Sequence, residues 1–299
     1  MQTNQTTVTE FILVGFSDHP ELQITVVGNI GIIILTITDA KLQTPIYFFL
    51  RNLSIVDIGY STTTAPKLLS TLVTRHATIS FAGCATQLYF FAVFVTAETC
   101  LLAVMAYDRF IAICYPFQYF VVMSKKLCIL LVTAVYILGI VNSTAHNIVI
   151  FSLDFCNSKI INHFFCDVPP LLSLSCSDTQ RAHFVNFILS TFFGGTTLLT
   201  VLISYIAIVI AILKISSAQG RKKAFNTCAS HLTTVSIFFG TVISMYSRPS
   251  SNLSSDKDKI TSIFYTLIIS SLNPFIYSLR NKDVKDAIGR LLDKIRLQK

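Results

Sequence analysis

Charged residues are scarce in this sequence, and tryptophan is absent. Only 13% of the 299 residues are charged, about half the share found in soluble domains. Hydrophobic residues make up 53% of the chain, which excludes a disordered polypeptide. They stand in long blocks rather than in short alternating or heptad patterns, so the lipid bilayer is the expected solvent.

Acidic residues are outnumbered by basic ones, 15 against 23, which gives a net charge of +8. A basic net charge suggests nucleic acid as a partner, but this sequence has no basic face interleaved with aromatic residues. Its Lys and Arg residues stand in short clusters between the apolar blocks. We therefore interpret the charge as membrane topology, and expect membrane lipid but no nucleic acid as a partner.

Seven apolar blocks predict the fold. Most exceed the roughly 20 residues that a helix needs to cross a hydrocarbon core of about 30 Å. A transmembrane β-barrel would instead alternate over about ten residues. The predicted fold class is an all-α membrane protein, a seven-transmembrane helix bundle. The blocks cover about Leu22–Ile37, Ile46–Val73, Ala82–Ile113, Leu127–Phe151, Ala182–Ile212, Phe225–Tyr246 and Ile260–Leu279.

The distribution of basic residues predicts the orientation. With the N-terminus extracellular, 16 of the 23 Lys and Arg residues lie on the cytoplasmic side and 7 outside, in keeping with the positive-inside rule. The first 21 residues have no Lys or Arg and no continuous apolar core, so we expect an internal helix rather than a cleavable signal peptide to lead insertion. One domain is expected: an extracellular tail over 1–21, the bundle over 22–279, and a cytoplasmic amphipathic helix and tail over 280–299.

Four of the eight cysteines fall on the oxidising outer side. Cys84 starts the third block, and the other three share one outer loop, so two disulfides are possible in three pairings. A bridge from Cys84 to the loop would pin the loop across the mouth of the bundle. The remaining cysteines are expected to be free thiols in or at the inner ends of the spans. The outer four are Cys84, Cys156, Cys166 and Cys176.

The outer segments also carry candidate modification and metal sites. Asn4 begins an acceptor sequon in the extracellular tail, and we predict glycosylation there; Asn252 begins another in the last outer loop. His163 and Cys166 are metal-ligand types, but no third ligand stands nearby. We therefore predict no metal site and no cofactor.

Polar side chains interrupt the apolar blocks at membrane depth. Ionisable residues there cost about 3 kcal/mol on insertion scales and are functional candidates by default. We expect a polar core between helices, in which carboxylates hold water or a small cation and change occupancy as the helices move. The alternative is a static hydrogen-bond network that only fixes packing. The residues concerned are Asn29, Asp57, Glu98 and Asn273, with the pair Asp108 and Arg109 at an inner helix end.

Several motifs, spread in order along the chain, resemble those of a known protein family. They are Gly28-Asn29, Leu42 to Leu50, Leu53-Ser54 with Asp57, Met105 to Arg109, Ser204-Tyr205, Lys223 to His231, and Leu272 to Asn281. Together they resemble the signature blocks of vertebrate olfactory receptors, a branch of the rhodopsin-like G-protein-coupled receptors. The resemblance implies a multi-pass plasma-membrane receptor without enzymatic activity, whose partners are a small volatile odorant and the stimulatory olfactory G protein.

The resemblance also implies an activation switch at the cytoplasmic end. Arg109 would pair with Asp108 at rest and be released when the sixth helix swings outward. Asn273-Pro274 with Tyr277 would form the partner switch in the seventh helix, because proline frees a backbone carbonyl and lets the helix bend. Tyr205 would meet Tyr277 and Arg109 in the active state.

A ligand cavity in the outer half of the bundle is likewise implied by the family. Its mostly apolar lining, with a few hydroxyls, would suit a small volatile molecule. Phe91 stands where amine receptors keep an acidic counter-ion, which argues against an amine ligand. The family further suggests the disulfides Cys84–Cys166 and Cys156–Cys176. The predicted ligand-binding residues are Phe91, Val95, Thr96, Phe193, Phe239, Val242, Tyr246, Ile263 and Thr266.

The first helix departs from the family. Leu22–Ile37 gives 16 residues, or roughly 24 Å, and roughly 15 residues ahead of Gly28 are missing relative to the family. A receptor-like chain with impaired surface delivery or signalling is therefore an alternative function. A small-solute transporter is less favoured because internal repeats and broken helix pairs are not evident. A membrane enzyme is also less favoured, because the sequence shows no nucleophile–base pair.

Overall fold

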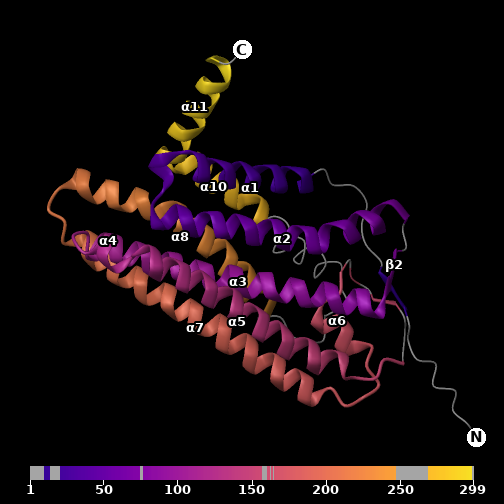
Figure 1. Cartoon of the computed structure of the whole chain (residues 1–299). Coiled ribbons are helices and arrows are strands. Elements are labelled where there is room, and N and C mark those ends of the chain that lie inside the picture. The colour runs from indigo at the N-terminus through magenta and orange to yellow at the C-terminus, as the bar shows by residue number, and fades with distance from the viewer. Residues whose placement is uncertain are drawn as a thin grey trace, which may run out of the picture.

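Long helices dominate the protein. The computed structural model describes residues 10–13, 21–74, 77–156, 160–161, 163, 165–246 and 269–297. The long helices lie side by side in one bundle, with α4 and α11 at one end and β2 and α6 at the other (Figure 1). This architecture confirms the helical membrane fold predicted above.

The helices follow the apolar blocks. Seven of them, α1, α2, α3, α5, α7, α8 and α10, correspond in order to the predicted spans, and the part of the last block before residue 269 lies outside the described residues. A separate helix, α11, follows the bundle, as the amphipathic pattern predicts. The bounds are α1 Glu21–Thr38, η1 Ala40–Leu42, α2 Pro45–Thr74, α3 Phe81–Cys114, α4 Tyr119–Val122, α5 Lys125–Phe151, α6 Val168–Ser173, α7 Gln180–Leu213, α8 Ala218–Tyr246, α10 Ile269–Arg280 and α11 Lys282–Leu297.

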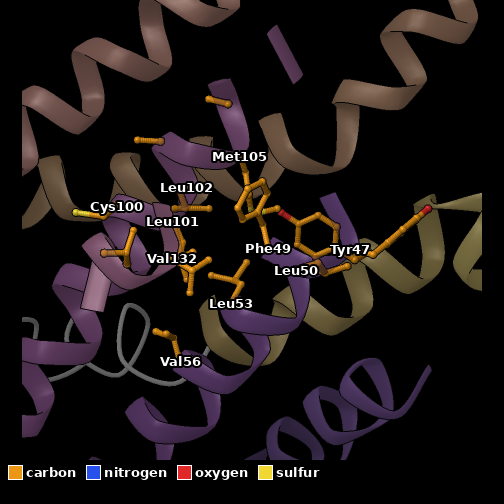
Figure 2. Packing of buried hydrophobic residues seen from close by; sticks show 14 of the residues in the cluster. Tyr47, Phe49, Leu50, Leu53, Val56, Cys100, Leu101, Leu102, Met105 and Val132 are labelled. Carbon is orange, nitrogen blue, oxygen red and sulfur yellow. The ribbon is translucent and has the colours of Figure 1, made fainter. Parts of the chain in front are cut away.

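Helix α3 lies at the centre of the core. Leu101, Leu102 and Met105 are fully buried and pack against the α2 residues Phe49 and Leu53, with Val132 of α5 nearby (Figure 2). By contrast, α5 and α7 expose many large apolar side chains on their outer faces. An apolar surface of this kind suits lipid rather than water.

Three of the described helices, α3, α5 and α7, are long and apolar enough to cross a bilayer by length and composition alone. Among the described residues, α1 contributes a shorter apolar stretch, Thr25–Thr38. Helix α1 has 18 residues against 30 in α2, and it stops short of the outer end of α2 (Figure 1). The first span is therefore short in the structure too.

A small sheet lies at the outer end and was not predicted. Strand β1 (Glu10–Leu13) pairs antiparallel with β2 (Ala77–Ser80), with Glu10 opposite Ser80, and parallel with β3 (Ile160–Ile161). Strands of two to four residues give too little periodic signal to be recognised in a sequence. The sheet ties the N-terminal segment to the outer loops.

Candidate functional site

The buried polar residues of the bundle meet around Asp57 on α2. Asn273 on α10 donates from Nδ2 to both carboxylate oxygens of Asp57, at 3.3 and 3.0 Å. Both side chains are buried. The structure thus joins two residues of the predicted polar core, and links the second helix to the last one of the bundle.

Glu98 and Asn29 complete the predicted core. Glu98 on α3 is buried and interacts electrostatically with Asp57. Its Oε1 atom has no hydrogen-bond partner within the residues that the structure describes. Asn29 is also buried and donates from Nδ2 to the Thr25 carbonyl at 3.1 Å. A buried carboxylate oxygen without a protein donor can accept a hydrogen bond from water or contact a cation.

A close helix contact sets the height of Asn29 in the bundle. A Cβ atom added at Gly28 would lie 3.0 Å from Cβ of Pro274. Glycine therefore lets α1 approach α10 at the proline that lies inside this helix. Proline has no N–H to donate within a helix, so α10 has a built-in place to bend beside Asn273, as the predicted switch requires.

The cytoplasmic end of α3 carries Asp108 and Arg109. Their side chains lie 3.9 Å apart, measured from Arg109 Nε to Asp108 Oδ2. Asp108 has a shorter contact, because the Tyr119 hydroxyl on α4 donates to its Oδ1 at 2.8 Å. Burial and the Asp108 charge raise the pKa of Tyr119 above its ordinary value, so this hydroxyl stays protonated and donates at neutral pH.

A second polar contact connects α3, α7 and α8. The Tyr205 hydroxyl lies 2.7 Å from Nδ1 of His231, and Nε2 of His231 lies 3.1 Å from the Leu102 carbonyl oxygen. His231 is buried. An imidazole can donate from one nitrogen and accept at the other, so the ring bridges the carbonyl and the hydroxyl. Any outward movement of α8 must break this bridge.

Tyr277, the last predicted switch residue, is buried on α10. Its hydroxyl forms no hydrogen bond within the residues that the structure describes. In this structure Tyr205 contacts His231 rather than Tyr277 or Arg109. The contacts that the family resemblance implies for an active state are therefore distinct from the contacts seen here.

The predicted ligand-binding residues divide between two apolar clusters. Phe91 lies in the outer cluster, where its ring is 5.2 Å from that of Tyr60 and 4.8 Å from that of Phe165, and Val95 packs against the same cluster. Phe193, Phe239 and Val242 belong to or pack against the central cluster. The side chain of Tyr246 and the residues Ile263 and Thr266 lie outside the described part of the chain, as does the predicted glycosylation site Asn4.

Thr96 differs from the other predicted lining residues because its hydroxyl already has partners. It donates to the Ala92 carbonyl at 2.8 Å and accepts from Nδ2 of Asn142 on α5 at 2.8 Å. Asn142 and Thr96 are both buried. The hydroxyl therefore connects α3 to α5 in this structure.

Two disulfides shape the outer loop. Cys84 is bonded to Cys166 with a Cα–Cα distance of 5.6 Å, and Cys156 to Cys176 with 5.9 Å. Both pairings suggested by the family are confirmed. The Cys166 amide also donates to Gln87 Oε1 at 3.0 Å. The loop is thereby held against the outer end of α3, as expected.

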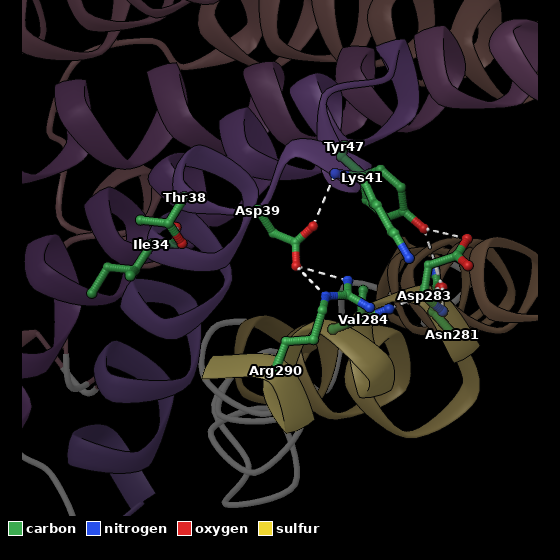
Figure 3. Close-up of polar contacts among 9 residues, drawn as sticks. All are labelled: Ile34, Thr38, Asp39, Lys41, Tyr47, Asn281, Asp283, Val284 and Arg290. Carbon is green, nitrogen blue, oxygen red and sulfur yellow. Dashed lines mark hydrogen bonds and ion pairs between the residues drawn. The ribbon is translucent and has the colours of Figure 1, made fainter. Parts of the chain in front are cut away.

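Helix α11 is joined to the first cytoplasmic loop by polar contacts (Figure 3). Arg290 contacts Oδ2 of Asp39 through Nη2 at 2.7 Å and through Nε at 2.8 Å. The Tyr47 hydroxyl lies 3.2 Å from Asn281 Oδ1 and 3.0 Å from Asp283 Oδ2. The hydrogen bond from Arg290, with one from the Lys41 amide, lowers the pKa of Asp39. These contacts fix where α11 leaves the bundle.

The sequence patterns did not reveal the contacts of Tyr119 and His231 or the exposure of Phe117. Tyr119 and His231 act through partners on other helices, which a sequence does not specify. Phe117 is 99% exposed in the turn between α3 and α4. An exposed phenylalanine at the cytoplasmic end is a candidate for contact with a partner protein.

Sequence comparisons give a consistent result. The family model described as olfactory receptor matches residues 22–295. Olfactory receptor 5AR1 of Mus musculus is 53% identical, covering 97% of this chain and 98% of the relative. Olfactory receptor 8J2 of Homo sapiens is also 53% identical, with 97% and 96% covered. The alignment to the mouse protein has 303 positions, more than the 299 residues of this chain, so some residues of that relative have no counterpart here.

A solved structure supports the fold. Squid rhodopsin is similar with a TM-score of 0.68 at 20% sequence identity, covering 92% of this chain and 83% of the rhodopsin chain. At this identity the similarity concerns the fold alone.

Proposed function

Because the chain belongs to the olfactory receptor family, we propose that it binds a small, mostly apolar volatile ligand and activates a stimulatory heterotrimeric G protein. Olfactory receptors are signalling receptors rather than enzymes, and they are multi-pass proteins of the plasma membrane. The family membership therefore confirms the resemblance on which the sequence interpretation rested.

The observation that carries the signalling proposal is the pair of contacts at the cytoplasmic half of the bundle. Tyr119 holds Asp108, and His231 bridges Tyr205 and Leu102. The His231 contacts join α8 to α7 and α3 and would break if α8 moved outward, whereas the Tyr119 contact holds the carboxylate beside Arg109 on α3. A ligand that binds the separated arrangement more tightly would shift the population toward it.

The ligand proposal rests on the chemistry of the outer and central clusters. Phe91, Phe193 and Phe239 offer aromatic surface in these clusters, and Phe91 stands where amine receptors keep an acidic counter-ion. Dispersion contacts and one or two hydrogen bonds suit a neutral volatile molecule. An amine would leave its charge without a counter-ion.

The second candidate function is a receptor-like chain with impaired delivery to the cell surface. The 18 residues of α1 favour it. One experiment separates the two: cell-surface staining of the tagged chain beside a cyclic AMP readout over an odorant panel. The proposed function predicts surface staining with an odorant response, whereas the alternative predicts little staining and little response.

The Arg109→Ala variant tests the coupling step in the same assay. We expect loss of the cyclic AMP response with similar surface staining, because the cation serves the active-state contact rather than folding. Arg181→Ala, at the exposed outer start of α7, is the control and should respond like the parent chain. An Arg109→Ala chain that still raises cyclic AMP would contradict the proposal.

A further inference from the structure

A cavity of about 580 Å³ opens at the cytoplasmic end of the bundle, beside the helix α4 that carries Tyr119. It lies between the start of α2, the short helix α4 and the start of α5. Its deepest side chains, Leu42, Met123 and Cys128, are buried. Since α2 and α5 both begin on the cytoplasmic side, the cavity stands at the level of the inner lipid headgroups.

The charges around this cavity have one sign. Arg51 on α2 and Lys125 on α5 line it, and none of its lining residues is acidic. Within the described residues neither side chain forms an ion pair, and the Arg51 guanidinium instead lies 5.2 Å from the centre of the Phe48 ring. Two cations without counter-ions, held on separate helices, favour an anionic occupant.

The same cavity continues into an apolar surface. Phe48, Phe120 and Ile129 line it, and Phe120 is 72% exposed. Further along the helices, Ile55 on α2 and Leu130 on α5 are exposed as well. A ligand with an anionic head and acyl chains would place its head between the cations and its chains against this surface.

We propose that this cavity binds an anionic phospholipid of the cytoplasmic leaflet with a polyphosphorylated inositol headgroup. The cavity is larger than a single phosphate requires, and its two cations come from different helices, so a headgroup with several phosphates can contact both at once. Basic pockets between transmembrane helices on the cytoplasmic side suit such headgroups. The bound lipid would join α2 to α5 beside the loop that holds Asp108.

The test uses the purified full chain and native mass spectrometry with phosphatidylinositol 4,5-bisphosphate. The Arg51→Gln/Lys125→Gln variant should bind this lipid about 30-fold more weakly than the parent chain. The matched control is Lys41→Gln/Lys126→Gln, which removes two exposed cations from the same side but from outside the cavity. The control should bind within about twofold of the parent.

Further arms identify the ligand chemistry. Phosphatidylserine should bind more weakly than the bisphosphate lipid, because its headgroup carries only one net negative charge. Soluble inositol trisphosphate should also bind more weakly, because it has no acyl chains to contact the apolar surface. If the double Gln variant is unstable, Phe120→Asp replaces it, since Phe120 is 72% exposed and contacts only the edge of the Tyr119 ring among the described aromatic residues, and the new carboxylate would repel an anionic headgroup. Equal binding by parent and variants, equal loss in the control, or equal binding of phosphatidylserine would overturn the proposal. Loss of G-protein coupling with unchanged lipid binding would assign the surface to the G protein instead and overturn it too.

Discussion

The hydroxyl of Tyr119 donates to Asp108 Oδ1 at 2.8 Å, whereas Arg109 Nε lies 3.9 Å from the other oxygen of the same carboxylate. The resting state of this carboxylate therefore depends on the tyrosine as much as on the neighbouring arginine. Hydrogen bonds to charged groups are worth more than neutral ones, at about 1.5 to 3 kcal/mol. Helix α4 thus helps to hold the cytoplasmic end of α3 in its resting arrangement.

Replacing Tyr119 by Phe should raise basal signalling. The change removes one hydrogen bond to Asp108 but keeps the ring, so we expect basal cyclic AMP to rise up to about tenfold at equal surface level. Tyr115→Phe is the matched control, because Tyr115 is exposed and no hydrogen bond of its hydroxyl occurs within the described residues. Equal basal signals in the two variants would show that the contact does not restrain activation.

The two disulfides should differ in their contribution to stability. The Cys84–Cys166 bridge closes 82 positions and Cys156–Cys176 closes 20, which correspond to about 4.5 and about 3.3 kcal/mol in the chain-entropy picture. Cys84→Ser should therefore lower the thermal midpoint more than Cys156→Ser, measured on the purified chain. Peptide mapping without reduction must also find Cys84 linked to Cys166, and a free Cys84 thiol in the parent would refute the pairing.

The ion pair between Asp39 and Arg290 should hold α11 in place. Asp39→Asn removes the charge that Arg290 contacts, so amide hydrogen exchange in Lys282–Leu297 should become faster. Lys285→Gln, an exposed position on the same helix, should leave exchange unchanged.

The pH dependence of that contact follows from the sign of the pKa shift. Because the pKa of Asp39 is lowered in the folded chain, its stabilising effect is present above the unfolded value of about 4 and is lost as the pH falls through the folded value. The difference between the parent chain and Asp39→Asn should therefore be constant from pH 6 to pH 8. It should disappear only in acid, and a difference that vanished near neutral pH would point to another titrating group.

The sequence alone predicts the spans well because their signal is local. Long apolar blocks give the helices to within a few residues, as at Lys125–Phe151, where the block begins at Leu127 and Ser124 caps the helix through the Leu127 amide. The Asp57–Asn273 contact also follows from the family motifs. The polar core is thus predictable from motifs that stand far apart in the chain.

The rest depends on tertiary contacts that have no local signal. His231 belongs to a recognised motif, but its partners Tyr205 and Leu102 lie on other helices and depend on helix rotation. Tyr119 stands in a loop whose path decides whether it reaches Asp108. The hydrogen bond between Thr96 and Asn142 could not be predicted from the sequence, because it requires the α3–α5 interface to be known.

The first helix supports a final prediction. Its apolar block, Leu22–Ile37, has 16 residues, or about 24 Å against about 30 Å of hydrocarbon. Local thinning of the bilayer can absorb such a deficit at fractions of a kcal/mol per Å. A short span alone therefore does not prevent insertion.

Packing decides which end of the helix is deficient. Gly28 lies against Pro274, and Asn29 is buried beside that contact, so α1 cannot slide outward without breaking it. The missing turns must fall at the outer end, where α1 stops short of α2 (Figure 1). We expect the parent chain to keep its seven-helix fold but to reach the surface poorly and to respond weakly to odorants.

Adding about fifteen apolar residues between Gln23 and Ile24 should therefore raise surface staining and the cyclic AMP response, because about four extra residues already span the deficit and the remainder continues the helix beside α2. A Gly/Ser insertion of equal length at the same place is the control and should give no gain, since it lengthens the chain without adding apolar helix. Equal gains from both insertions would mean that chain length, not helix length, is limiting. If the parent chain already matches the lengthened one in staining and response, the short helix has no functional cost and the alternative function loses its basis.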